Sequence, residues 1–305
     1  MAARHSLLTV HAHPDDETIA TGGTMARYAK SGHRVVCVTC TGGEHGEIVV
    51  PELDTAENHA RLAEIRKVEL ERALAHLGPI DHHWLGYIDS GMMGTPENEA
   101  AGSFWQADVD EATGRLVRLV RQTRPQVVVG YNDFGGYGHP DHIRASLVAK
   151  LAFERAGDPD AYPEQLRDGL DPWQALKLYE NVLDIARRQE FLDMIEAKGI
   201  QTWWAPPPDE TDEARTQREA HLAVMSDAQG PVTTRVDIGA FMETKLAAIG
   251  EHVTQLSKES FFLAFDADEW RTLQPTEDFT LRVSHLGVRI PEDDLFDGLP
   301  PEDAP

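Results

Sequence analysis

The sequence of 305 residues contains only two cysteines, Cys37 and Cys40. Their C-x-x-C spacing is one that redox and metal sites use. The surrounding segment 35–40 is rich in β-branched residues, however, and predicts a strand, in which positions 37 and 40 point to opposite faces. We therefore expect two buried cysteines rather than a reactive pair.

A long hydrophobic segment is also absent, because no stretch approaches the ~20 consecutive apolar residues of a membrane-spanning helix. The chain starts with a few residues that lead directly into a predicted strand at residues 7–10. This leaves no room for the apolar part of a signal peptide. The sequence thus predicts a cytoplasmic protein.

Basic residues are few: 28 Lys and Arg stand against 52 Asp and Glu, and the formal net charge is −24. A surface this acidic repels the phosphates of nucleic acids and anionic lipids. We therefore expect neither a nucleic acid nor a membrane as a partner, and solubility explains most of the charge. The composition, 41% hydrophobic and 26% charged, is that of an ordinary globular protein.

The glycine-rich fingerprints of nucleotide-binding proteins are missing too. The pairs Gly22-Gly23 and Gly42-Gly43 form neither G-x-G-x-x-G nor a P-loop. An α/β oxidoreductase of the Rossmann type therefore remains only an alternative interpretation, because the fingerprint after the first strand is missing.

The first half of the chain alternates short apolar strands with helices. Strands are predicted at residues 7–10, 35–40, 84–85 and 125–131. Helices are predicted at residues 24–31, 55–77 and 109–122, and a last one carries Leu147, Val148, Leu151 and Ala152. This order predicts an α/β, Rossmann-like three-layer sandwich with a mainly parallel sheet covered on both faces. We expect residues 1–157 to form this catalytic core.

Residues 158–305 are predicted to form a smaller C-terminal α+β region that completes the substrate pocket. Segments 157–173 and 205–212, rich in Pro, Asp and Gly or Glu, are expected to be connectors, with a strand at 176–183 between them. Two or three helices follow. The Pro-, Asp- and Glu-rich end from Pro291 is expected to be a flexible acidic tail that frays after Asp297.

Two short polar segments stand directly after predicted strands. One is His-Ala-His-Pro-Asp-Asp-Glu at residues 11–17, and the other is Gly-Gly-Tyr-Gly-His-Pro-Asp-His at residues 135–142. In a parallel α/β sheet, the loops that leave the carboxyl ends of strands form the ligand crevice. The two segments can therefore converge on one site.

These segments hold the ligand types of a catalytic zinc site, which has three protein ligands and an open position. His13 and Asp16 lie three residues apart across a turn stiffened by proline, and His142 is the best third ligand. The same donors also suit Fe²⁺. Asp15, between the first two ligands, is placed to be the general base.

The remaining polar residues of the second segment complete the predicted chemistry. His139 could donate a proton to the leaving amine or stabilise the oxyanion, with Asp141 orienting its ring, and Tyr137 could reach the same face. Asp16 or Asp141 alone could be an ordinary helix cap, and a single histidine could be a surface or core residue. Their concentration in two loops after strands favours function.

Together the two motifs resemble those of the PIG-L (LmbE-like) zinc deacetylases, a family that includes a deacetylase and an amidase of the mycothiol pathway. The resemblance implies hydrolysis of an N-acyl, typically N-acetyl, amide on an amino-sugar conjugate. It assigns the metal to His13, Asp16 and His142. It also makes Asp15 the general base, His139 the acid or charge-stabilising histidine, and Tyr137 a mobile tyrosine near the oxyanion.

Three further residues are expected to bind substrate. Arg66 lies one turn before Leu70 on the inward stripe of its predicted helix, where an arginine either snorkels or points into the pocket. The resemblance favours the pocket and a sugar contact. Asp89 resembles a family residue that binds substrate hydroxyls, although it could be an ordinary loop acid, and Glu44 is a weaker candidate of the same kind.

Some choices stay open on the sequence. Residues 41–47 and 291–298 look like the amidase, whereas Gly138 looks like the deacetylase. A non-catalytic metal- or sugar-binding module would need the ligands but not Asp15 and His139. The chain could also form a homo-oligomer.

Overall fold

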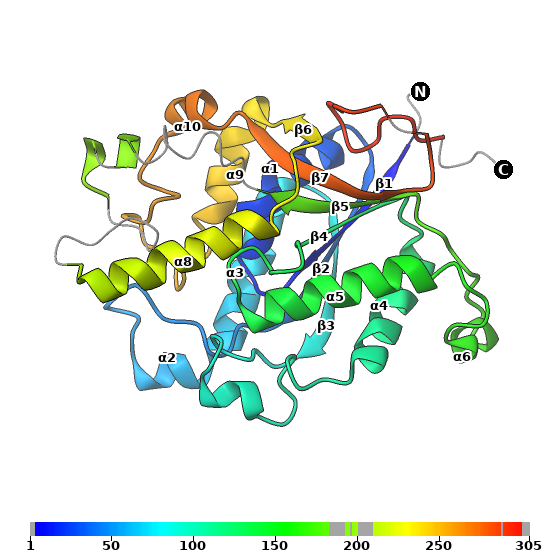
Figure 1. Cartoon of the computed structure of the whole chain (residues 1–305), viewed down its shortest axis with the longest axis horizontal. Coiled ribbons are helices and arrows are strands. Elements are labelled where there is room, and N and C mark those ends of the chain that lie inside the picture. The colour runs from blue at the N-terminus through cyan, green and yellow to red at the C-terminus, as the bar shows by residue number, and fades with distance from the viewer. Residues whose placement is uncertain (1–3, 183–192, 196, 201–209, 288, 301–305) are drawn as a thin grey trace.

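The computed structural model describes residues 4–182, 193–195, 197–200, 210–287 and 289–300 (Figure 1). Within these residues the strands form one seven-stranded sheet in the order β3-β2-β1-β4-β5-β7-β6. Five strands are mutually parallel: β1 (Ser6–His11), β2 (Arg34–Thr41), β3 (Ile80–Tyr87), β4 (Val127–Gly130) and β5 (Lys177–Val182). β7 (Thr276–Ser284) runs antiparallel to both β5 and β6 (Thr234–Asp237). The predicted α/β class with a mainly parallel sheet is confirmed.

Helices cover both faces of the sheet. Core residues of α1 (Asp16–Lys30), α3 (Leu62–Leu77) and α9 (Met242–Ile249) join one hydrophobic cluster, and those of α4 (Val109–Thr123) and α5 (Pro140–Arg155) join the other. Neighbouring strand residues alternate between these clusters, as the pleat of a strand requires.

The two cysteines follow this alternation. Cys37 lies in the first cluster and Cys40 in the second, and both are free and fully buried. Burial raises the pKa of both thiols. The prediction of two separate buried strand cysteines is therefore confirmed.

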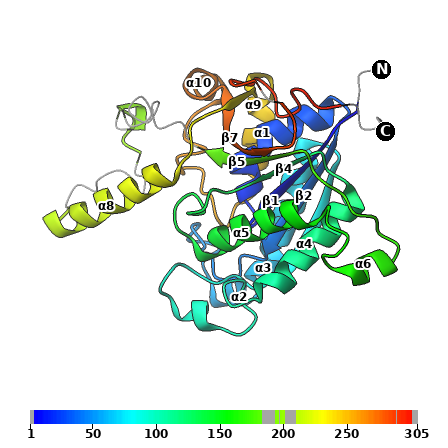
Figure 2. The same ribbon diagram turned by 45° about the vertical axis from the view of Figure 1, so that its right-hand side comes forward.

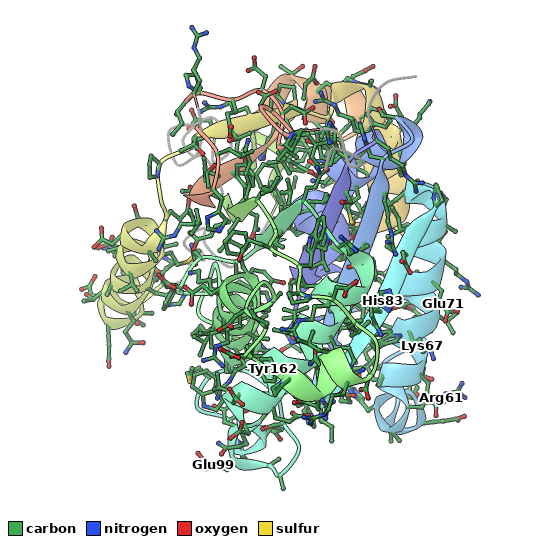
Figure 3. The ribbon with its side chains drawn as sticks, turned by 90° about the vertical axis from the view of Figure 1, so that its right-hand side faces the viewer. Arg61, Lys67, Glu71, His83, Glu99 and Tyr162 are labelled. Atoms are coloured by element: carbon green, nitrogen blue, oxygen red, sulfur yellow. The ribbon has the colours of Figure 1, made fainter. Side chains whose placement is uncertain are left out.

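The amphipathic character of α3 shows how a helix is seated on the sheet. Its apolar residues Leu70 and Leu74 are buried. Figure 3 shows the side chains of Lys67 and Glu71 pointing away from the sheet into solvent. Apolar positions three and four residues apart therefore hold the helix against the core.

The structure corrects several predicted boundaries. α1 begins at Asp16, not near residue 24, because Gly22 and Gly23 lie within the helix, where Gly23 packs so closely on Ile238 that a Cβ would come 2.7 Å from it. The predicted helix 55–77 is two helices, α2 (Ala56–Ala60) and α3, separated at Arg61. The short strand at 84–85 belongs to the longer β3, and the expected connector 157–173 contains α6 (Pro163–Arg167).

The C-terminal region continues the sheet of the first half through β5, β7 and β6. Its helices include α8 (Asp212–Ala228) and α10 (Ala267–Leu273), with short 3₁₀ helices at Gly239–Phe241 and, in the first half, Pro96–Glu99. α8 has no buried residue and extends away from the body (Figure 2). The predicted connector at 205–212 falls mostly outside the described residues.

The acidic end of the chain is not a free tail where the structure describes it. Leu295 is fully buried, and the ring of Phe296 stacks on that of Tyr28 with centroids 4.3 Å apart. Glu292 is also buried and pairs with Lys177 at 2.6 Å. The expected tail therefore packs on the core because it carries these anchors, and residues 301–305 lie outside the described ones. Among the described residues, no helix is long and apolar enough to cross a membrane.

Candidate metal centre and active site

The two polar segments of the sequence lie side by side at one edge of the sheet. β1 pairs with β2 on one side and with β4 on the other, so the chain order reverses between β1 and β4. In open α/β sheets such a switch point creates a crevice at the carboxyl ends of the strands. The loop after β1 and the loop after β4 both open into it.

Three donor atoms form a nearly equilateral triangle in this crevice. Nδ1 of His13 lies 3.5 Å from Oδ2 of Asp16 and 3.3 Å from Nε2 of His142, and that Nε2 lies 3.4 Å from the same Asp16 oxygen. In a tetrahedral zinc site with bonds of about 2.0–2.1 Å, ligand atoms lie about 3.3–3.4 Å apart. The spacing therefore fits the metal that the sequence predicts.

The outer nitrogens of both rings are held by other groups. Nδ1 of His142 lies 3.1 Å from the carbonyl of Gly135, and Nε2 of His13 lies 3.2 Å from a carboxylate oxygen of Asp141. Each contact places the ring proton on the outer nitrogen and leaves the inner one bare, as in the outer sphere of metal-binding histidines. Gly135 has φ 66°, and a Cβ there would come 2.5 Å from that of His142, so this turn requires glycine.

A second donor set overlaps the first one. Groups from His13, Asp89, His139 and Asp141 also lie close enough together to hold an ion, as do those of His13, His139 and His142. In the four-residue set both oxygens of Asp141 accept bonds from the N–H and hydroxyl of Ser90, and both oxygens of Asp89 accept the N–H groups of His45 and Gly91. In the triangle, Oδ2 of Asp16 accepts the N–H of His13 at 2.8 Å. We therefore interpret Asp141 as the partner that orients His13.

The expected contact of Asp141 with the ring of His139 is made by the backbone of Asp141. The backbone N–H of Asp141, not its carboxylate, donates to Nδ1 of His139 at 3.2 Å, because His139 is the N-cap of α5. The other ring nitrogen of His139 then carries the proton. Burial, with the nearby His13 and His142, lowers the pKa of His139 to about 2, so its ring is neutral. The Tyr137 ring lies 4.8 Å from that of His142.

Asp15 stands next to the donor triangle in an unusual backbone conformation, with φ 107° and ψ −36°. Its Oδ2 lies 3.2 Å from the guanidinium of Arg66. Burial raises the pKa of the Asp15 carboxyl to about 6, although the charge of Arg66 opposes the shift. A carboxylate in this position is suited to accept a proton.

Arg66, for which the sequence predicts a sugar contact, is held by groups of the chain itself. Its side chain is 4% exposed, and it donates to the carbonyls of Gly43 and Pro14 at 2.9 and 2.6 Å as well as to Asp15. Gly43 has φ 69°, and a Cβ there would come 2.0 Å from the guanidinium. The arginine therefore ties the loops after β1 and β2 together, because the glycine-rich loop wraps around it.

Asp89 and Glu44 lie beside each other at the same edge of the sheet. The N–H of Asp89 donates to Oε2 of Glu44 at 2.8 Å, and an Asp89 carboxylate oxygen lies 3.6 Å from Nε2 of His13. The structure thus places Asp89 next to the candidate metal centre. Glu44, which is half-buried, lies one step farther out.

Comparisons with known proteins agree with this site. The family model of the GlcNAc-PI de-N-acetylases (PIG-L) matches residues 8–153. The chain is 43% identical over 302 residues to 1D-myo-inositol 2-acetamido-2-deoxy-alpha-D-glucopyranoside deacetylase 1 of Frankia alni, a match that covers 96% of this chain and 100% of that protein. A protein of the same name from Catenulispora acidiphila is 44% identical over 308 residues, which cover 97% of this chain and 90% of its own.

The chain belongs to the PIG-L family. It is therefore a hydrolase of amide C–N bonds, which confirms the enzyme class predicted from the two motifs. The comparisons give no support to the oxidoreductase alternative. The solved N,N'-diacetylchitobiose deacetylase from Pyrococcus horikoshii has a similar fold, with a TM-score of 0.62 and 21% identity over 92% of this chain and 84% of its own.

Three residues of this PIG-L site were not singled out from the sequence. Ser90 holds Asp141, and Glu17 accepts the N–H of Asp15 at 3.0 Å. His252, in the C-terminal region, contacts Glu17 at 3.1 Å. Glu17 and Ser90 directly follow residues of predicted function, which was a usable signal, whereas nothing local marks His252.

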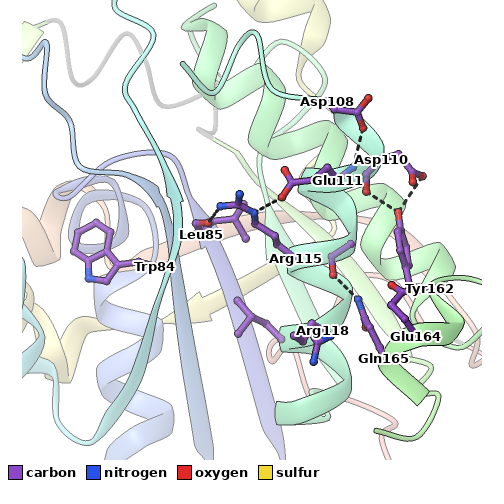
Figure 4. Close-up of a pocket in the computed structure, with 12 residues that line it drawn as sticks. Trp84, Leu85, Asp108, Asp110, Glu111, Arg115, Arg118, Tyr162, Glu164 and Gln165 are labelled. Atoms are coloured by element: carbon purple, nitrogen blue, oxygen red, sulfur yellow. Dashed lines mark hydrogen bonds and ion pairs between the residues drawn. The ribbon is translucent and has the colours of Figure 1, made fainter. Parts of the chain in front are cut away.

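A surface cavity of about 540 Å³ lies away from the PIG-L motifs (Figure 4). It is formed by residues of β3, α4 and α6, and none of the predicted site residues lines it. Among its charged groups, Arg115 pairs with Glu111, whereas Arg118 pairs with Asp168 outside the lining. We assign it no part in the reaction.

Proposed function

We propose that the chain removes the acetyl group of 1D-myo-inositol 2-acetamido-2-deoxy-α-D-glucopyranoside in a zinc-dependent reaction. The single observation that carries the proposal is the triangle of His13 Nδ1, Asp16 Oδ2 and His142 Nε2, with Asp15 beside it. The relatives named for this substrate are similar to the chain over nearly its whole length, which supports the choice of amide.

Zinc fits the donors, since two imidazole nitrogens and one carboxylate are typical of its catalytic sites. The same set would also accept Fe²⁺. When bound, the ion would supply a Lewis acid that activates water and polarises the amide carbonyl. Its holders would be His13, Asp16 and His142.

The residues around the triangle would handle protons and charge. Asp15 would accept a proton from the attacking water and pass it to the nitrogen of the leaving amine. His139 keeps its free N–H because Asp141 donates to the opposite ring nitrogen. It would donate that N–H to the oxyanion, and Tyr137 would approach the same oxygen.

Asp89 and Glu44 support an amino-sugar substrate. A carboxylate has about four lone-pair positions, so the backbone bonds that each accepts leave capacity for further donors. Sugar and inositol hydroxyls are such donors. Homo-oligomer formation and a cytoplasmic location stay predictions.

The test compares three amides under one set of conditions with zinc-loaded protein. They are the acetamido-glucosyl-inositol, a simple N-acetyl amine of similar size, and a thioether conjugate of the kind a mycothiol amidase would cleave. We expect release of acetate with the highest kcat/KM for the first. Equal kcat/KM for the first two would contradict the amino-sugar substrate but not the amidase chemistry. A preference for the conjugate would assign the chain to the amidase group.

A further inference from the structure

The backbone of Asp15 lies in a region that residues other than glycine rarely occupy. Its φ is 107°, and such a conformation persists only when surrounding contacts hold it. Among the positive-φ residues with side chains in the described part of the chain, Asp15 is the one located at the donor triangle. The contacts that hold it therefore bear on where its carboxylate points.

One such contact comes from Glu17, two residues later. Oε2 of Glu17 accepts the N–H of Asp15 at 3.0 Å, while the Asp15 carbonyl accepts the N–H groups of Thr18 and Ile19 in α1. A glutamate that reaches back to the N-cap N–H is common at helix starts. Such a residue is usually at the surface, however, whereas Glu17 is 0% exposed.

The buried carboxylate of Glu17 is itself held from the other half of the chain. Its Oε1 lies 3.1 Å from Nε2 of His252, which is also 0% exposed and follows α9. Nδ1 of His252 is buried and has no hydrogen-bond partner. His252 therefore contacts Glu17 through Nε2 alone, and this contact fixes the orientation of the Glu17 carboxylate.

We propose that Glu17 and His252 are positioning residues that hold Asp15 in the conformation from which its carboxylate acts on the substrate water. The inference rests on the proposed role of Asp15 as the base. A residue of the C-terminal region thus controls the geometry of a motif more than 230 positions earlier. Neither residue touches the substrate, and both act through Asp15.

The experiment uses amide side chains that replace one histidine nitrogen at a time. The amide nitrogen of glutamine occupies the place of Nε2, and that of asparagine the place of Nδ1. His252→Gln should keep the bond to Glu17 and retain near wild-type kcat. His252→Asn and His252→Ala should lower kcat by roughly 10- to 100-fold, the effect of a misplaced catalytic group, with KM and zinc content unchanged.

A double-mutant cycle separates positioning from stability. In protein that already carries Asp15→Asn, the change His252→Ala should lower kcat no further, because its only route to the reaction is gone. The matched control is Thr254→Val. Thr254 lies in the same loop as His252, and the change removes its buried hydrogen bond to Glu69 of α3. It should lower Tm but leave kcat unchanged.

Each outcome decides the question. Equal kcat for the glutamine and asparagine variants, or additive effects of His252→Ala and Asp15→Asn, would overturn the positioning role while Asp15 could still be the base. Near wild-type kcat in Asp15→Asn itself would overturn both proposals. If His252→Ala does not fold, the glutamine and asparagine pair decides.

Discussion

Nδ1 of His13 lies 3.3 Å from Nε2 of His142, although 129 positions of sequence separate the two residues. His13 follows β1, and His142 lies in the first turn of α5, the helix after β4. The site therefore forms only when these two strands pair, and its ligands are scattered in the unfolded chain. An ion bound by these residues would consequently stabilise the folded state.

The overlapping donor sets differ in which substitutions should abolish metal binding. We expect Asp16→Ala and His142→Ala to lose zinc affinity by more than the roughly 10- to 100-fold that removal of an outer partner causes. His139→Ala should retain one zinc per chain. Metal analysis after dialysis, together with Tm with and without a chelator, measures both. Loss of zinc from His139→Ala with retention in Asp16→Ala would assign the ion to the other set.

Asp15→Asn should separate metal binding from chemistry. The amide cannot accept the proton of the attacking water, so we expect kcat to fall by a factor of roughly 10² to 10⁴. Zinc content should stay at the wild-type value, because the carboxylate of Asp15 is not part of the donor triangle. Steady-state kinetics and metal analysis on the same preparation test this. A zinc-free variant would instead place Asp15 among the ligands.

Arg66 provides a contrast between the sequence and the structure. The sequence predicts a sugar contact, whose loss would mainly raise KM. The structure predicts that Arg66→Ala releases the loop at Gly43 and the carboxylate of Asp15, and hence lowers kcat and Tm. Arg66→Lys should recover little, because a single ammonium group cannot reproduce the spread of bonds that the guanidinium makes. A higher KM at unchanged kcat would favour the original interpretation.

The case of Arg66 shows what kind of information the sequence carries. Its periodicity placed Arg66 correctly on the inward side of α3, where the side chain is buried. Periodicity cannot say what an inward side chain meets, because the loop that wraps around it comes from another part of the chain. The same holds for Asp141. Its carboxylate contacts Ser90 and His13, and its contact with the neighbouring His139 is made by the backbone N–H.

The fold was predictable where local signals agree with burial. Strands β1, β2 and β4 are short apolar runs, and the motifs follow them directly. The sequence does not predict the start of α1, because two glycines, which normally weaken helices, lie inside it, and one of them, Gly23, packs closely on Ile238. His252 was missed because a lone histidine in a loop has no local sign of its partner, which is 235 positions away.

The buried pair of Lys177 and Glu292 predicts a large effect on stability. The two side chains are 0% and 2% exposed, and their contact distance is 2.6 Å. Glu292→Ala should lower the free energy of unfolding by about 3–5 kcal/mol, because it leaves the lysine charge buried without its partner. Urea unfolding of the variant measures this.

The matched control is the double variant Lys177→Met with Glu292→Leu, which removes both charges and keeps much of the volume. We expect it to be considerably more stable than Glu292→Ala alone. If the two variants were equally destabilised, loss of packing and not an unpaired charge would be the cause.

The packing of Phe296 on Tyr28 has a consequence for how the protein is made. Leu295 and Phe296 belong to the same hydrophobic cluster as Leu7 of the first strand. During translation, this face of the nascent sheet stays partly uncovered until Leu295 and Phe296 have left the ribosome. Chaperone dependence should therefore be greatest late in synthesis, when the apolar surface is largest and its final cover is still missing.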